Sequence, residues 1–286
     1  MSTSNSGPSC AGLRVLLVGT YPPPYGGIAS HLTTLIPGLR ARGASDIAVV
    51  SLGDVSETET RDGFTVYRFN VKHQLRRLLP PRSWRIMLAA WRSLRRYGLP
   101  MNAMVRECVK AILVDGVAQR HRSNVVSFYA SHSHIELLPL TRVWGRRRPA
   151  VLTVFGEVYG NAQFMKQYRD LFAEMLHRAH AVVASSKHCA QSFQQLGIDR
   201  QVEPVYYGVD TEAEPTPELR AAFRAEHGFH AQDVVVLFLG RFLREMGLDV
   251  LFDAWPALVE AEPQLRLVVA GARGELSDDA ARLAER

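Results

Sequence analysis

Short runs of apolar residues alternate along the chain with segments in which apolar residues recur every three or four positions. The runs have the length of buried strands, and the recurring pattern is typical of helices that cover a sheet. In the first two thirds of the chain the pattern predicts strands at 15–18, 47–52, 65–69, 125–129, 150–154, 181–184 and 202–205. It predicts helices at 28–42, 136–144, 163–178 and 187–196. This order predicts an α/β fold with a parallel, doubly wound sheet, and Pro37 predicts a kink or an early end in the first helix.

The alternation restarts after a segment of different composition. Residues 210–217 contain Thr, Glu and two prolines, and beyond them the pattern predicts helices at 217–227, 248–260 and from Ser277, and strands at 234–239 and 265–270. Two parallel strands do not form an independent sheet, because each needs neighbours for its backbone groups and cover for both faces. We therefore expect an N-terminal Rossmann-like domain at 13–207, a hinge at 208–217 and part of a second Rossmann-like domain at 218–286.

The first predicted strand runs into a loop that is rich in proline and glycine, within the sequence RVLLVGTYPPPYGG at residues 14–27. The prolines stiffen the loop, whereas Gly26 and Gly27 have no Cβ and let a ligand approach the backbone. The loop follows the carboxyl end of a strand, where ligands of parallel sheets bind, and N–H groups at the start of the next helix favour phosphate. It lacks the GxGxxG pattern of nicotinamide and flavin sites. The alternative is a strand-to-helix turn that binds nothing.

The composition indicates a globular chain without a secretory leader. Of the 286 residues 47% are hydrophobic, which suffices for a sizeable core. Residues 1–12 are rich in Ser, Gly and Asn and have no apolar stretch, so we expect a disordered lead-in there rather than a signal peptide. No apolar run reaches the roughly 20 residues of a membrane span. Cys10, Cys108 and Cys189 are few and widely spaced, which fits a reducing compartment, the cytoplasm, and shows no metal-binding pattern.

Positive charge is concentrated in residues 72–122. This segment contains twelve Lys and Arg residues and two acidic residues, a local charge of +10 in a chain whose formal net charge is +6. It lengthens one connection of the predicted sheet to about 50 residues, so we interpret it as a basic insert. The charge indicates an anionic partner, and nucleic acid is not favoured because no aromatic-rich binding module accompanies it.

Part of the basic insert has the pattern of a helix that lies on a membrane surface. After Ser83, a plausible N-cap, large apolar residues form one helical stripe, which three arginines flank. The stripe is Trp84, Met87, Leu88, Trp91 and Leu94, and the arginines are Arg85, Arg92 and Arg96. Such a helix can place Trp and Leu among acyl chains and the arginines against anionic headgroups. The alternative is that the stripe packs onto the sheet and the arginines are only solvated.

Four segments resemble, in order, the motifs of glycosyltransferase family four, whose members are retaining, metal-independent enzymes of the GT-B fold. YPPPYGGI is similar to the PPxxGG loop of the family. AVVASSKHCAQSFQQLG, PVYYGVDTE and VVVLFLGRFLREMGLDVLFDAW are similar to three later segments, and the resemblance extends from residue 14 to 271. It implies a first domain on the acceptor side, a second domain that binds a nucleotide-sugar donor, and no cofactor or metal ion.

The resemblance also implies roles for single residues. Gly26 and Gly27 would contact the donor phosphates or sugar, and Arg241 would hold the diphosphate across the cleft and offset the charge of the leaving group. The segment SFYASHSHIELLP resembles a loop in which a histidine often lies near the reacting sugar. His132 or His134 is therefore expected to bind a hydroxyl or to aid proton transfer. A solvated or capping histidine is the alternative for each of them.

Other positions depart from the family pattern. Met246 stands where the family has a phosphate-binding lysine, so Arg244 is expected to reach the phosphates in its place. Phe155 stands where a histidine is often found, which leaves the sequence TVFGE. Tyr207 stands at an asparagine position and is expected to pack in the hinge.

The family's Glu-x7-Glu motif, which contacts the donor sugar, belongs after Gly271, and neither Glu275 nor Glu285 has its spacing. We therefore expect a C-terminally truncated, inactive chain. Its full-length form would move a sugar from a nucleotide-sugar to a hydroxyl acceptor, lipid-linked or polysaccharide, with retention, in the cytoplasm or at the inner face of the membrane. Two alternatives stay open: a GT-B-like binding protein that has lost the donor chemistry, and a GT-B sugar epimerase.

Overall fold

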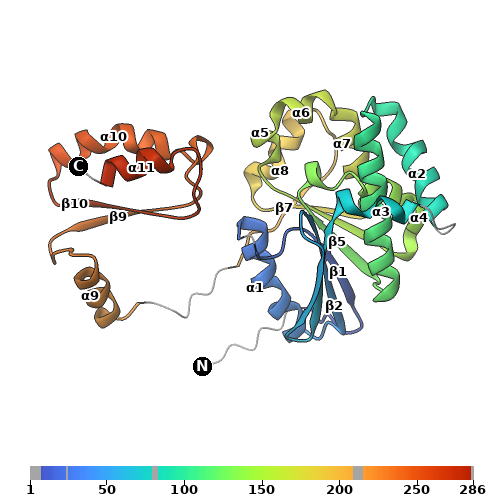
Figure 1. Cartoon of the computed structure of the whole chain (residues 1–286), viewed down its shortest axis with the longest axis horizontal. Helices are drawn as coiled ribbons and strands as arrows, with labels where there is room; N and C mark the ends of the chain where they lie inside the picture. Colours follow the sequence, from blue (N-terminus) through green and yellow to red (C-terminus); the bar gives the residue numbers. More distant parts are fainter. Residues whose placement is uncertain (1–7, 24, 79–82, 209–214, 285–286) are drawn as a thin grey trace. The chain divides into compact units, whose positions relative to one another are not determined.

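The computed structural model describes residues 8–23, 25–78, 83–208 and 215–284. The chain divides into two compact units, Met1–Tyr207 and Gly208–Arg286 (Figure 1). Much of the predicted lead-in 1–12 and hinge 208–217, as well as Glu285, lies outside the described residues. Within those ranges, no helix combines the length and the apolar character that crossing a membrane requires.

The first unit is built on an eight-stranded sheet in the order β3-β4-β2-β1-β5-β6-β7-β8. Its strands are β1 (Arg14–Val18), β2 (Asp46–Gly53), β3 (Glu57–Arg61), β4 (Phe64–Asn70), β5 (Val125–Tyr129), β6 (Ala150–Val154), β7 (Ala181–Ala184) and β8 (Glu203–Pro204). Among the described pairs only β3 and β4 are antiparallel. The prediction of an α/β fold with a parallel sheet is confirmed.

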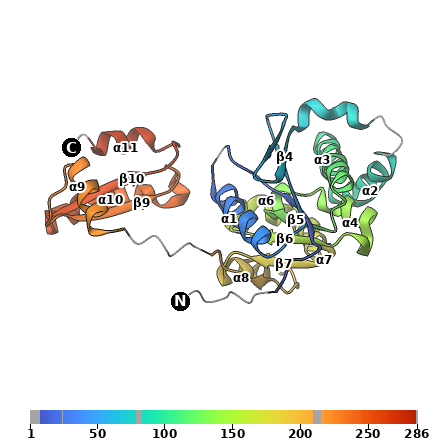
Figure 2. The same ribbon diagram turned by 90° about the horizontal axis from the view of Figure 1, so that it is seen from below.

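Helices cover both faces of this sheet. They are α1 (Gly27–Ala41), α2 (Trp84–Leu94), α3 (Met101–Arg120), α4 (Leu137–Trp144), α5 (Glu157–Gly160), α6 (Ala162–Gln167), α7 (Arg169–Arg178) and α8 (Lys187–Gln195), with short 3-10 turns η1 (Val71–Leu78), η3 (Arg95–Tyr97), η4 (Ser131–Ser133) and η5 (Gly145–Arg147). Because side chains alternate along a strand, Val15 and Leu17 pack with Leu32 of α1, whereas Leu16 and Val18 belong to the larger core of the opposite face. Figures 1 and 2 show α1 on one side of the sheet and α2, α3 and α4 on the other.

The first helix does not end early at Pro37. α1 continues to Ala41, and the N–H of Arg42 bonds to the carbonyl of Gly38. A proline inside a helix removes one backbone hydrogen bond. Here the side chains of Leu32 and Ile36 before the proline are buried against the sheet, and Leu39 after it packs against the same cluster, so packing holds the helix together on both sides of Pro37.

The sequence pattern missed strand β3, which reads ETETR and contains no apolar residue. It forms an edge strand because a tight turn at Asp62 and Gly63, both with positive φ, folds it antiparallel onto β4. An Asp-Gly pair in such a turn is a hairpin signal that polar flanking residues had hidden.

The basic insert contains a core helix. α3 spans twenty residues, and Ala111, Val114 and Ala118 of its inner side are fully buried in the larger core. α2 is also divided between core and solvent, since Ile86 and Leu94 are buried. The segment 72–122 is therefore part of the sheet's cover as well as the carrier of the positive charge.

The second unit contains a two-stranded parallel sheet of β9 (Val234–Leu239) and β10 (Leu265–Ala270). Its helices are α9 (Pro217–Glu226), α10 (Leu248–Ala261) and α11 (Ser277–Ala284), with the 3-10 turn η6 (Arg244–Met246). Several apolar side chains of β9, among them Leu237 and Leu239, are exposed, because none of the described residues covers them.

Candidate functional site

The glycine loop, residues 19–27, joins β1 to α1 at the carboxyl edge of the first sheet. A Cβ placed on Gly26 or Gly27 would meet no atom within 4 Å, so the backbone of both residues is open. The first turn of α1 contains no acidic residue, and no side chain caps it at Gly26. The N–H groups of this turn, which have no partner within the helix, are available to an anion.

His132 and His134 both follow β5, but the structure gives them different surroundings. His134 is buried, and its Nδ1 lies 2.7 Å from Oε1 of Glu136, which is fully buried. The ring of His132 is only partly buried, and its Nε2 lies 3.1 Å from the hydroxyl of Ser133. Burial lowers the pKa of His132, and the charges of His134 and Lys110 lower it further. Of the two imidazoles, His132 is the more exposed, and its Nδ1 is buried without a hydrogen-bond partner in the described residues.

The buried carboxyl of Glu157 and the partly buried ammonium of Lys110 hold the residues on either side of His132. The N–H of Ser131 donates to Oε1 of Glu157 at 2.7 Å, and the other oxygen of Glu157 accepts the N–H of Phe155. The ammonium of Lys110 donates to the carbonyl of Ser133 at 3.0 Å. Burial raises the pKa of Glu157, although the backbone hydrogen bonds oppose this. The sequence pattern had given Lys110 and Glu157 no role, because each acts on a distant part of the chain.

An aromatic cluster joins the end of the first unit to helix α1, just after the glycine loop. The ring of His31, one turn into α1, stacks on Tyr207 with 4.2 Å between ring centroids and an interplanar angle of 28°. Tyr129 at the end of β5 and Phe155 after β6 complete the cluster. Burial lowers the pKa of His31. His31 is a residue of this edge that the sequence analysis did not single out.

In the second unit, Arg241 and Arg244 lie in the loop that follows β9. Both side chains are more than half exposed, and each has a carboxylate partner. Nη2 of Arg241 lies 2.9 Å from Oε1 of Glu245, and Nη1 of Arg244 lies 3.5 Å from Oδ2 of Asp249. Both guanidinium groups can therefore meet an anionic ligand if it displaces these carboxylates.

The loops that follow β9 and β10 pack backbone to backbone. A Cβ on Gly271 would collide with the carbonyl of Gly240, and one on Gly274 would collide with the carbonyl of Phe242. The carboxylate of Glu275 accepts the N–H of Arg244 at 3.0 Å. Glycines are therefore required to bring the second loop against the loop that carries the two arginines.

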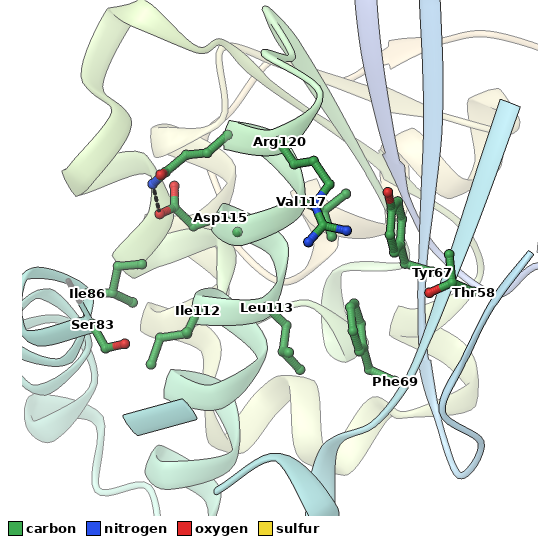
Figure 3. A pocket seen from close by; sticks show the side chains of 12 residues that line it. Thr58, Tyr67, Phe69, Ser83, Ile86, Ile112, Leu113, Asp115, Val117 and Arg120 are labelled. Carbon is green, nitrogen blue, oxygen red and sulfur yellow. Dashed lines mark hydrogen bonds between the residues drawn. The ribbon is translucent and has the colours of Figure 1, made fainter. Parts of the chain in front are cut away.

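A separate cavity of about 470 Å³ lies between α2, α3 and the sheet edge (Figure 3). Apolar side chains such as Phe69, Ile86 and Ile112 line it, together with the exposed Arg120. The carboxylate of Asp115 is engaged by the indole N–H of Trp144 at 2.7 Å and by Gln119. The accessible cation and the apolar walls suit an amphipathic anion.

The outer face of α2 exposes large apolar side chains. Trp84 is 65% exposed, Leu88 47% and Trp91 48%, and the guanidinium of Arg95 lies 4.1 Å from the ring centre of Trp91. The interpretation in which the whole stripe packs onto the sheet is therefore wrong for these three residues. Arg96, expected beside the stripe, instead pairs with Glu174 of α7.

Neither unit shows a metal centre in the ranges described, because no three His, Cys, Asp or Glu residues there are grouped to hold an ion. The three cysteines are free thiols. The positively charged side chains in the loops that follow β9 and β10, and in the cavity beside α2, are all arginines. A metal-independent site remains the prediction of the sequence.

Two family models match the chain. The model of Glycosyltransferase Family 4 matches residues 107–213, and that of Glycosyl transferases group 1 matches residues 220–286. Together they cover more than half of the chain, and the glycine loop lies before both ranges. A comparison with curated protein sequences finds no match.

Solved structures show the same fold at low sequence identity. A trehalose-6-phosphate structure from E. coli, bound with UDP-2-fluoro glucose, is 16% identical with a TM-score of 0.58, over 95% of this chain and 68% of the other. Anabaena HepE in complex with UDP is 16% identical with a TM-score of 0.60, over 96% and 65%. The trehalose 6-phosphate synthase of Burkholderia multivorans is 14% identical with a TM-score of 0.57, over 96% and 68%. The chain thus spans about two thirds of the length of these proteins. It belongs to the glycosyltransferases of the GT-B fold, with Family 4 sequence in its first unit and group 1 sequence in its second.

Proposed function

We propose that this protein transfers a sugar from a nucleotide-sugar donor to a hydroxyl acceptor with retention of anomeric configuration. The observation that carries the proposal is the placement of Arg241 and Arg244 in a glycine-packed loop at the carboxyl end of β9, within the group 1 match. Two exposed guanidinium groups at such a loop offset the charge of a leaving nucleoside diphosphate. The HepE structures, which are complexes with UDP and with UDP-glucose, support a donor of this class.

The residues of the first unit have the complementary role in this proposal. The open N–H groups at Gly26 and Gly27 would bind a donor phosphate or sugar hydroxyl, and His132 would bind a hydroxyl of the acceptor or of the donor sugar. Since arginines supply the positive charge, the proposal includes no metal ion and no cofactor. Glu245 has to release Arg241 when the donor diphosphate arrives.

Equilibrium binding tests the donor site. Isothermal titration with UDP-glucose and other nucleotide-sugars should show binding that Arg241→Met weakens about tenfold or more, because a hydrogen bond to a charged group contributes about 1.5–3 kcal/mol. Arg220→Met is the matched control, since Arg220 is an exposed arginine of α9 in the same unit. The proposal is wrong if no nucleotide-sugar binds, or if Arg241→Met binds as tightly as the wild type.

The acceptor in this proposal is a lipid-linked or polysaccharide hydroxyl, reached from the inner face of a membrane. The exposed face of α2 and the local charge of +10 support this interpretation, and the cavity beside α2 suits the apolar part of such a molecule.

Sedimentation with anionic vesicles tests the membrane part of the proposal. The vesicles should carry the protein down at low salt and less at high salt, since each basic residue near the surface contributes about 1 kcal/mol. Trp84→Ala and Trp91→Ala should reduce pelleting, whereas Tyr159→Ala, at an exposed aromatic residue of α5, should not. Equal pelleting with neutral vesicles would contradict the membrane proposal.

One observation favours a second function, a binding protein without transfer. Met246 is exposed at the position of the expected lysine, and a thioether does not neutralise a phosphate. An assay for released UDP in the presence of donor separates the two functions. The assay uses a form of the protein that carries the Glu-x7-Glu motif, because a chain without that motif is expected to be inactive in either case. Binding of donor with no UDP released by any hydroxyl acceptor then favours the binding protein.

A further inference from the structure

Arg68 is a buried arginine that joins the edge of the first sheet to the glycine loop. Its side chain is 6% exposed. Nη1 donates to Oε1 of Glu57 at 2.6 Å and to Oε2 of Glu59 at 3.1 Å, and Nη2 donates to the carbonyl of Pro22 at 2.5 Å. One guanidinium therefore links three segments, namely β4, β3 and the loop that follows β1.

The strand register explains why a buried cation is tolerated at this position. Phe64, Val66 and Arg68 alternate onto the face of β4 that packs with α1. Glu57 lies directly opposite Arg68 on β3, and Glu59 lies opposite Val66, so both carboxylates are within reach of the guanidinium. A buried charge is costly unless it is paired and hydrogen-bonded. The polar sequence of β3 supplies that compensation.

The loop depends on an external donor because its own backbone offers little. Proline has no N–H, so Pro22 and Pro23 cannot hold the loop through backbone donors. Before them, the N–H of Gly19 bonds to the carbonyl of Val50, and the buried ring of Tyr21 packs edge-on against Phe64. Within the described part of the loop, the bond from Arg68 to Pro22 is the last hydrogen bond before Gly26.

We propose that Arg68 is a positioning residue for the glycine loop, which sets where the open N–H groups at Gly26 and Gly27 lie. The proposal rests on the donor role assigned above to this loop. Substrate-binding groups lose effect when they are displaced by about 1 Å, so fixing the carbonyl of Pro22 fixes the start of the binding segment. Lysine does not replace Arg68 fully, because a single ammonium lacks the planar fork that spans two carboxylates and a carbonyl.

Backbone dynamics test this directly. We would measure ¹⁵N order parameters of the Gly26 and Gly27 amides in the deuterated wild type and in Arg68→Met, Arg68→Lys and Arg61→Met. Arg61 is the matched control, because it is an exposed arginine of β3 paired with Glu59. The order parameters should be about 0.85 in the wild type and in Arg61→Met, fall below about 0.6 in Arg68→Met, and be intermediate in Arg68→Lys.

The affinity for UDP-glucose is the second readout. It should fall about tenfold in Arg68→Met, partly recover in Arg68→Lys and stay unchanged in Arg61→Met. Unchanged order parameters in the Arg68 variants, or a wild-type loop already below about 0.6, would overturn the positioning role. If Arg68→Met does not fold, Arg68→Lys decides the comparison. If the wild type binds no UDP-glucose, the donor proposal fails while the order parameters still decide the role of Arg68.

Discussion

Replacing Lys110 by methionine should destabilise the first unit strongly, and more so at high pH. The ammonium lies 3.1 Å from Oε2 of Glu107 and 4.0 Å from Oε2 of Glu136, and both carboxylates are almost fully buried. Burial raises the pKa of Glu107, against the effect of Lys110. Burial also acts to raise the pKa of Glu136, but the charges of His134 and Lys110 outweigh it and lower that pKa.

The size of the effect follows from what methionine leaves behind. Removing one partner of a buried ion pair costs about 3–5 kcal/mol when the remaining charge has no other partner, and we expect the lower end of that range here because Arg106 still pairs with Glu107 and His134 with Glu136. For a unit of this size, a loss of about 1 kcal/mol lowers Tm by roughly 2–4 °C, so we expect a fall of about 10 °C. The carbonyl of Ser133 also loses its donor, which loosens the loop that carries His132.

The dependence on pH has a defined sign. In the wild type, the lowered pKa of Glu136 contributes stability that is present above its unfolded pKa and is lost as the pH falls. In the variant, among the described residues, Glu107 keeps only Arg106 and Glu136 keeps only His134, so losing the Lys110 charge raises the pKa of both carboxyl groups, and the stability lost with that charge is larger at high pH, where they are ionised. Both effects make the difference between wild type and variant grow with pH.

Thermal unfolding followed by circular dichroism at about pH 5 and about pH 8 measures this difference. Lys166→Met is the matched control, since Lys166 is exposed on α6, and its Tm should equal that of the wild type. The double variant Lys110→Met/Glu136→Gln should regain part of the lost stability, because one buried charge is removed. A Tm loss for Lys110→Met as small as that of the control, or the same loss at both pH values, would refute the reasoning.

Three other substitutions have defined outcomes. Gly27→Ala should leave Tm unchanged because a Cβ there meets no atom, so a loss of UDP-glucose affinity in titration would report ligand approach rather than misfolding. His31→Phe keeps the stack on Tyr207 but removes the titratable imidazole. Because burial lowers the pKa of His31, the wild type should lose the stability that this group contributes as the pH falls below about 6.5, and the variant should not show that loss. Measuring Tm against pH for both proteins tests this. Gly274→Ala should make residues 215–284 more sensitive to limited proteolysis, because its Cβ would collide with the carbonyl of Phe242.

The periodic pattern predicted the order of most strands and helices because burial against a sheet imposes apolar runs. It missed elements in which only one face is buried, or in which polar side chains pair with a buried charge. β3 consists of polar residues that compensate Arg68, and α3 lay within a segment whose dominant feature was its positive charge. β3 is held by its hairpin turn and by Arg68, and α3 by the burial of its inner side chains in the larger core.

The candidate site was predictable only in part, for a similar reason. Motifs identified Gly26, Gly27, Arg241 and the histidines, but not the groups that hold them in place. Arg68 donates to a carbonyl that lies 46 residues earlier in the chain, and Lys110 donates to a carbonyl that lies 23 residues later. Glu157 accepts a backbone N–H that lies 26 residues earlier. Such partners leave no spacing signal in a single sequence, so they become visible only when the fold brings them together.

A titration with UDP-glucose, followed by backbone NMR of the whole chain, tests the central proposal most directly. If the protein uses a nucleotide-sugar donor, the amides of Arg241 and Gly271, in the loops that follow β9 and β10 of the second unit, should shift on titration, and so should those of Gly26 and Gly27 in the glycine loop of the first unit. An absence of shifts, or shifts confined to the cavity around Arg120, would contradict a donor site at these loops.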